Sequence, residues 1–205
     1  LIVLDPDWLL QTSQVDTFED DLADWHVWKP FGPARGYWRD RTAGAELIAH
    51  PTQQPAKVLH VRKPDEKSPD CAIWNFPAGR SGKISLQMLA GKDSQGFSIA
   101  LNNRFFNPTD DRAERESAFV FCVATAGSSE DSIILIPDQW HTLTVEWNMD
   151  QKHTQVSLNG KVVSREEVKR NLFGGVSYLR IRSTAEDIDL IGASFSRIEV
   201  EIQAE

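Results

Sequence analysis

The chain has 205 residues and 40% hydrophobic residues, which is the size and composition of one large globular domain or two small ones. Its formal net charge of −8 repels phosphate groups, so nucleic acid and anionic membranes are poor candidates for the main partner. No apolar run approaches the roughly 20 residues of a membrane-spanning helix, so we expect a soluble protein.

The first residues, LIVLDPDWLLQ, have neither an initiating Met nor the basic start of a signal peptide. They read as the last strand of a preceding domain, followed by a short helical turn over Pro6–Gln11. We therefore expect a processed product or a piece of a longer protein. Residues 1–14 would be a lead-in, and residues 15–205 a single β-sandwich domain.

Strand patterns dominate the rest of the chain, and only Arg165–Asn171 has a second short helical pattern. Turn residues such as Pro51, Pro64 and Gly96 separate the strands. The predicted strands are Val15–Glu19, Ala45–Ala49, Val58–Arg62, Cys71–Phe76, Lys83–Leu89, Phe97–Asn102, Ala118–Val123, Ser132–Ile136, His141–Trp147, Thr154–Leu158, Tyr178–Ser183 and Ser194–Ile202. This pattern predicts an all-β fold, a two-sheet antiparallel β-sandwich or jelly roll.

Successive side chains of a strand point to opposite faces, so alternation assigns an apolar and a polar face to each strand. The Asn159-Gly160 pair tolerates the positive φ angles of a type I′ turn and predicts a hairpin. If the jelly roll brings the strands together, one polar surface would carry Asn102, Thr142, Thr144, Glu146, Tyr178, Arg180 and Arg182.

The stretch WHTLTVEW, followed by VSLNGKVV, resembles the paired strands of concanavalin A-like (laminin-G-like) jelly-roll domains. GGVSYLRIRSTA and GASFSRIEVEI resemble their final strands, and DTFEDDLADW resembles the first strand, which pairs with the last. The resemblance extends roughly from Val15 to Ile202 and implies a concanavalin A-like sandwich. Such domains occur as sugar-binding modules, as accessory domains of β-propeller glycosidases and sialidase-like proteins, and as enzymes.

Enzymes of this family place acids in an E-x-D-x-x-E pattern along one strand of the concave sheet, where two carboxylates flank the glycosidic bond. The nearest approaches here are Glu114-Arg115-Glu116 and Glu199-Val200-Glu201, both expected to be solvated. The Q-I-H strand of the lyases and a G-x-S-x-G elbow are also missing, and the histidines do not have zinc-ligand spacing. We therefore predict no catalytic residue. The alternative is a glycoside hydrolase or polysaccharide lyase that acts across the concave face.

Sugar binding is favoured by a segment in which Trp25, Trp28, Tyr37 and Trp38 alternate with arginines. Indoles stack on the C–H faces of sugars, and arginine donates to their oxygens. The simpler reading is that these aromatics anchor the segment on the core, and that Arg180 and Arg182 are solvated or neutralised by Glu146 or an aspartate. The predicted ligand-binding residues are Trp28, Trp38, Arg39, Asn102, Glu146, Tyr178, Arg180 and Arg182.

The resemblance also implies a structural calcium between the first and last strands, since hard oxygen donors suit Ca²⁺. Asp16, Glu19 and Asp189 are where its ligands would lie. Cys71 and Cys122 are either a disulfide or, preferably, two small buried residues. The cysteines do not determine the cellular compartment of the protein, and an extracellular or periplasmic location is slightly favoured.

The sequence as a whole predicts a non-catalytic carbohydrate-binding or accessory domain of a carbohydrate-active protein, with glycan as its partner. A preceding catalytic domain of the same polypeptide would be a second partner. A further alternative is a structural domain that packs on a catalytic partner through Phe105-Phe106 and the N-terminal segment.

Overall fold

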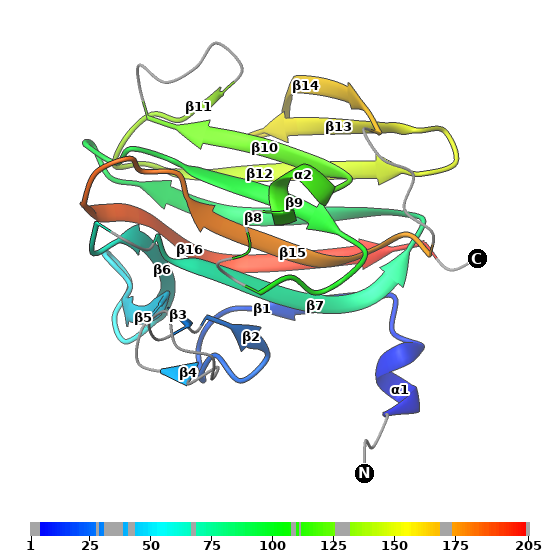
Figure 1. The fold of residues 1–205 in the computed structure, drawn as a ribbon, viewed down its shortest axis with the longest axis horizontal. Coiled ribbons are helices and arrows are strands. Elements are labelled where there is room, and N and C mark those ends of the chain that lie inside the picture. Colours follow the sequence, from blue (N-terminus) through cyan, green and yellow to red (C-terminus); the bar gives the residue numbers. More distant parts are fainter. Residues whose placement is uncertain are drawn as a thin grey trace.

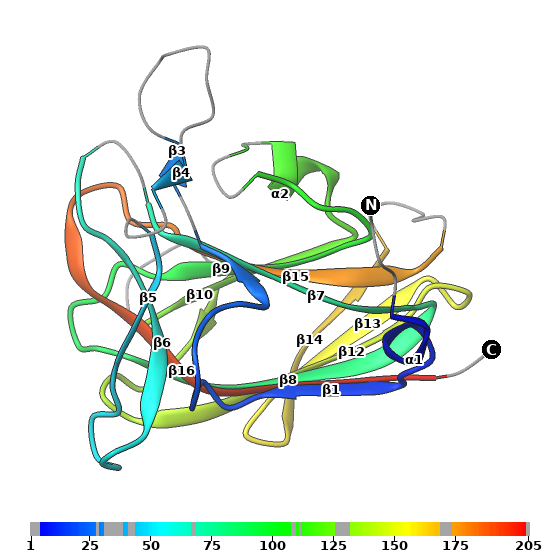
Figure 2. The same cartoon turned by 90° about the horizontal axis from the view of Figure 1, so that it is seen from below.

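Two sheets packed face to face make up the body of the protein (Figures 1 and 2). The computed structural model describes residues 5–27, 29–30, 39–40, 44–66, 69–107, 110, 112–125, 132–168 and 174–203. The predicted β-sandwich is confirmed. One strand pair departs from the antiparallel expectation, because β10 and β11 run parallel.

The large sheet has the order β14-β13-β12-β8-β16-β6-β5, and β1 also pairs with β16. Its strands are β14 (Lys161–Glu167), β13 (His153–Leu158), β12 (Trp140–Asn148), β8 (Ser81–Ala90), β16 (Asp189–Ile202), β6 (Lys57–Lys63), β5 (Glu46–Ala49) and β1 (Ser13–Asp16). The expected pairing of the first strand with the last is confirmed. The first strand starts two residues earlier than predicted, at Ser13, and ends at Asp16.

The small sheet has the order β11-β10-β9-β15-β7-β2. Its strands are β11 (Ile133–Ile134), β10 (Phe119–Ala124), β9 (Phe97–Asn102), β15 (Val176–Ser183), β7 (Cys71–Gly79) and β2 (Trp25–His26). A separate two-stranded ribbon consists of β3 (Lys29–Pro30) and β4 (Arg39–Asp40). Two short helices complete the described structure, α1 (Pro6–Leu9) and α2 (Arg112–Glu116).

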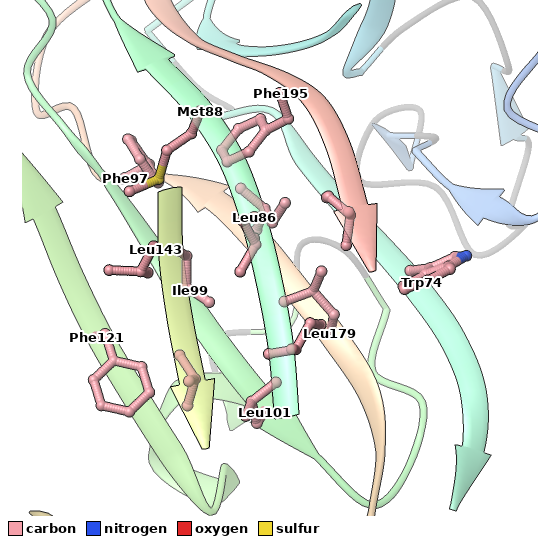
Figure 3. Close-up of a cluster of buried hydrophobic side chains, with 14 of the residues drawn as sticks. Trp74, Leu86, Met88, Phe97, Ile99, Leu101, Phe121, Leu143, Leu179 and Phe195 are labelled. Carbon is pink, nitrogen blue, oxygen red and sulfur yellow. The ribbon is translucent and has the colours of Figure 1, made fainter. Parts of the chain in front are cut away.

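The core lies between the sheets, as the alternation predicts. Leu86, Leu143 and Phe195 point inward from the large sheet, and Ile99, Leu101 and Leu179 meet them from the small sheet (Figure 3). Polar residues alternate with these positions, so each sheet has a polar outer face. These two outer faces are where function has to be sought.

The β13–β14 hairpin confirms the turn prediction and corrects a helix prediction. Asn159 and Gly160 have φ angles of 50° and 78°, as a type I′ turn requires. A helix was expected at Arg165–Asn171. This prediction is wrong for residues 165–167, which belong to β14 and pair with β13. A neighbouring strand that offers hydrogen bonds along its whole edge outweighs weak local helical propensity. Residues 169–173 lie outside the described part of the chain.

The two cysteines do not form a disulfide. Cys71 is on β7 and Cys122 is on β10, and β15 and β9 lie between those strands. Three interstrand steps put them about 14 Å apart, beyond the reach of a disulfide. Cys71 is buried as expected, whereas Cys122 is exposed.

Candidate functional site

The predicted polar surface is divided between the two sheets. Asn102, Tyr178, Arg180 and Arg182 belong to the small sheet, whereas Glu146 belongs to the large sheet. The expectation that Glu146 shares a surface with the two arginines is therefore wrong. Alternation gives each strand a polar face, but it does not say which sheet the strand joins.

On the small sheet, β15 and β9 bring the predicted residues into register. Tyr178 lies opposite Asn102, and Arg182 lies opposite Ser98. Helix α2 crosses above these strands on the outer side of the sheet (Figures 1 and 2). Helix α2 therefore covers part of this outer face, where Ser98, Asn102 and Arg180 are buried.

A carboxylate of α2 neutralises the two arginines. Glu114 Oε1 lies 3.7 Å from Arg180 Nη1 and 3.6 Å from Arg182 Nη1, and it accepts a hydrogen bond from Ser98 Oγ at 3.1 Å. Glu114 was expected to be a solvated loop residue, and Glu146 was considered as the neutralising group. Both expectations are corrected by α2, which folds down onto the sheet.

Burial under α2 limits which residues a ligand can reach. Arg180 is 1% exposed and Asn102 is 2% exposed, so neither presents its side chain to a ligand at the surface. Arg182 and Tyr178 are partly exposed. Burial also raises the pKa of the neighbouring Cys71 thiol, against the opposing effect of the Arg180 charge.

An aromatic group borders the covered region. Phe105 is 41% exposed, and its ring centroid lies 6.4 Å from that of Tyr178 and 4.9 Å from that of His26. Its neighbour Phe106 is only 6% exposed, with the Arg104 guanidinium 5.1 Å above its ring. The loop that was expected to present two aromatics therefore presents one, Phe105.

Phe105 also borders a pocket of about 720 Å³ beside α2. The pocket is lined by Arg104, Phe105, Phe106, Asn107, Asp110, Arg112 and Glu116. Arg112 binds Asp110 through its Nε at 3.0 Å and its Nη2 at 2.6 Å. These hydrogen bonds lower the pKa of Asp110 to about 2. Arg104 pairs with Glu116. An exposed ring next to planar, charged hydrogen-bonding groups suits the apolar faces and hydroxyls of a sugar.

The tryptophan-rich segment is only partly described. Trp25 is buried and stacks on Trp74, with centroids 5.7 Å apart, so it anchors the N-terminal segment on the core. Trp28 and Trp38 lie outside the described residues. Arg39 is in β4, and the position of its side chain is not described.

No protein-family profile and no curated protein matches the sequence. Solved structures do match its fold. They include a sialidase, at a TM-score of 0.60 and 13% identity over 93% of this chain. A glycoside hydrolase family 16 endo-glucanase from Bacteroides ovatus matches at a TM-score of 0.55 and 10% identity, over 91% of this chain and 99% of its own. The K1 cleaved adhesin domain of Lys-gingipain from Porphyromonas gingivalis matches at a TM-score of 0.54 and 12% identity, over 95% of this chain and 100% of its own.

The chain has the concanavalin A-like jelly-roll fold. At these identities the likeness concerns the fold alone. The match spans only 18% of the sialidase chain. In the described part of this chain, no helix is both long and apolar enough to cross a membrane.

The E-x-D-x-x-E acid pattern that was sought in the sequence is not found on the described strands of the small sheet. The outward positions of β9 are Ser98, Ala100 and Asn102, and β15 presents Tyr178 and the two arginines. The described carboxylates on this side, Asp110, Glu114 and Glu116, come from α2 and the segment before it. Each of them contacts an arginine, and none projects from the sheet as a nucleophile or acid would.

The three acids that the sequence analysis assigned to a calcium ion do not come together around one position. Asp16 accepts hydrogen bonds from Phe18 N at 2.7 Å and Trp25 Nε1 at 2.6 Å. Asp189 accepts from the backbone N–H groups of residues 95, 191 and 192. Asp16 pairs with Ile198 of β16, whereas Asp189 begins that strand. The partner strands advance only six residues over this stretch, so the two acids lie roughly 20 Å apart at about 3.3 Å per residue. Within the described ranges, Glu19 belongs to no group of three metal-binding side chains.

Proposed function

We propose that this chain is a non-catalytic carbohydrate-binding domain, an accessory part of a carbohydrate-active protein. It would hold a glycan on the outer side of the small sheet, with a sugar ring against Phe105 and Tyr178. Arg182 and the polar groups of the pocket beside α2 would bind its hydroxyls. Binding of this kind raises the local concentration of a linked catalytic domain on its substrate.

The observation that carries the proposal is the exposed Phe105 ring, which is held by Tyr178 and His26 at the mouth of a polar pocket. Large exposed aromatics beside polar groups are typical of binding sites. The non-catalytic role is supported by the outward positions of β9, which carry Ser98, Ala100 and Asn102 instead of acids. The accessory role is supported by the sialidase, in which the matched fold is a small part of a longer chain.

The test is a glycan array with the purified chain, followed by calorimetric titration of any glycan that binds. We expect Phe105→Ala to weaken the affinity at least about fivefold, because one stacked ring contributes about 1–3 kcal/mol. Ile188→Ala is the matched control, since it shortens another half-exposed apolar side chain, 48% exposed. If no glycan binds, or if both variants bind as the wild type does, the proposal is wrong.

A structural role is the second candidate. Several segments expose large apolar side chains, among them Ile134 with Ile136 and Ile188 with Leu190 and Ile191. Exposed apolar groups of this kind are typical of contacts with other proteins or domains. A chain that binds no glycan, but associates with a catalytic domain through these residues, would support this role.

A further inference from the structure

A second pocket lies on the opposite side of the molecule, on the outer face of the large sheet. Its volume is about 450 Å³, and it is formed at the ends of β8, β12, β13 and β16. Gln155, Glu146, Lys83 and Glu201 cross it as a row, each paired in register with the next on the neighbouring strand. Neighbouring strands are about 4.8 Å apart, so four strands place polar groups over roughly 14 Å.

The amide side chains of this pocket are oriented by internal hydrogen bonds. Gln155 Oε1 accepts from Arg165 Nε at 3.0 Å, and Asn148 Oδ1 accepts from two backbone N–H groups at 3.0 and 2.9 Å. Gln203 Oε1 accepts from Ser81 Oγ at 2.8 Å. Because the oxygen of each amide is engaged, its NH₂ group is the end left to donate to a ligand.

Glu146 supplies the complementary acceptor. Within the described part of the chain, its carboxylate has no hydrogen bond or ion pair, and the side chain is exposed. The neighbouring Lys83 is 3.0 Å from Glu201 and is therefore already neutralised. The row thus contains a carboxylate acceptor between amide and ammonium donors, and its four residues together carry a net charge of −1.

Two less polar residues complete the lining, Trp147 and Ile202. The indole of Trp147 is fixed by a hydrogen bond from its Nε1 to Gly79 O at 3.1 Å. Trp147 is only 3% exposed, so Ile202 supplies the exposed apolar part of the lining, next to the row of donors and acceptors.

We propose that this pocket is a second saccharide site, specific for a neutral sugar. Hydroxyl groups both donate and accept, so they match a row in which an amide and an ammonium group alternate with carboxylates. The local negative charge disfavours uronic and sialic acids. The site does not depend on Phe105 or Tyr178, because it lies on the other sheet. With both sites filled, the domain would hold two segments of a glycan, or two chains, at once.

The experiment is an amide-resolved NMR titration of the whole chain with cellotetraose, mannotetraose and galactotetraose, and with digalacturonate as the acidic comparison. We expect at least one neutral probe to shift the backbone amides of Lys83, Glu146 and Gln203. Glu146→Gln should weaken that binding about tenfold, because a charged acceptor becomes a neutral one. Glu199→Gln is the matched control, since it lies on the same face and its carboxylate is engaged by Arg197.

The outcomes separate the two sites. Shifts only around Phe105 and Tyr178 would overturn this second site and leave the proposed function standing. Shifts only around Glu146 would support the second site and count against the proposed one. The second site is also overturned if no neutral probe shifts these amides, if digalacturonate binds there as well, or if both glutamate variants have equal affinity.

Discussion

The outer faces of the two sheets have the same alternating sequence pattern and different environments. On the small sheet, α2 covers Arg180 and brings Glu114 to both arginines. On the large sheet, Arg197 and Lys83 lie open to solvent, each beside a glutamate of β16. The same side-chain types are therefore part of the packed structure on one face and solvated on the other. An arginine contributes to stability according to what covers it, and not according to the strand pattern that places it.

The largest expected effect is on the covered face. Arg180→Ala should lower the free energy of unfolding by about 3 kcal/mol, because it removes a buried cation and its packing and leaves Glu114 with a weaker partner. The measurement is urea denaturation followed by tryptophan fluorescence. A loss below about 0.5 kcal/mol would mean that α2 does not hold this cluster in solution.

A smaller, pH-dependent effect is expected from Asp110. Its pKa of about 2 in the folded chain is below the ordinary value of 3.8, so its stabilisation is complete above about pH 4 and is lost as the pH falls through 2. Because Arg112 is largely exposed and screened by solvent, we expect only about 1 kcal/mol. Unfolding curves at pH 6 and pH 2 should show that Asp110→Asn loses less stability on acidification than the wild type. Equal losses would contradict this assignment.

The smallest effect is expected on the open face. Arg197→Ala removes the same side-chain type as Arg180→Ala, but its partner Glu199 lies two residues away on the same outer face of β16, where both side chains are partly exposed. The free energy of unfolding should change by less than about 0.5 kcal/mol. If the two arginine variants are equally destabilised, the contrast between the faces is not one of burial.

Much of the fold could be predicted from the sequence, because strand alternation and turn chemistry are local. Asn159-Gly160 specified its hairpin, and Leu143 and Val145 specified the inner face of β12. The assignment of strands to sheets was not local, and for this reason Glu146 was placed with Arg180. The helix expected at Arg165 failed because the edge of β13 was available to pair with.

The candidate site was harder to predict, because it depends on a segment that crosses a sheet. The stretch DDRAERES has the composition of a solvated loop, and its charge alone does not show that Glu114 lies on Arg180 and Arg182. The adjacent pair Phe105-Phe106 in the sequence indicated an aromatic contact surface, and one of the two rings, Phe105, is exposed. Tyr178 was identified from alternation, and its ring lies 6.4 Å from that of Phe105. Arg182 was identified in the same way but lies four residues further along β15, and Asn102 is buried.

The position of β16 has a consequence for the order of events during synthesis. This last strand lies inside the large sheet, with β8 on one side and β6 and β1 on the other. Until residues 189–202 have left the ribosome, β8 and β6 have no strand between them, and the large sheet cannot close. The large sheet of this domain therefore forms only after residues 189–202 have been synthesised, and nascent chains expose apolar sheet surface until then.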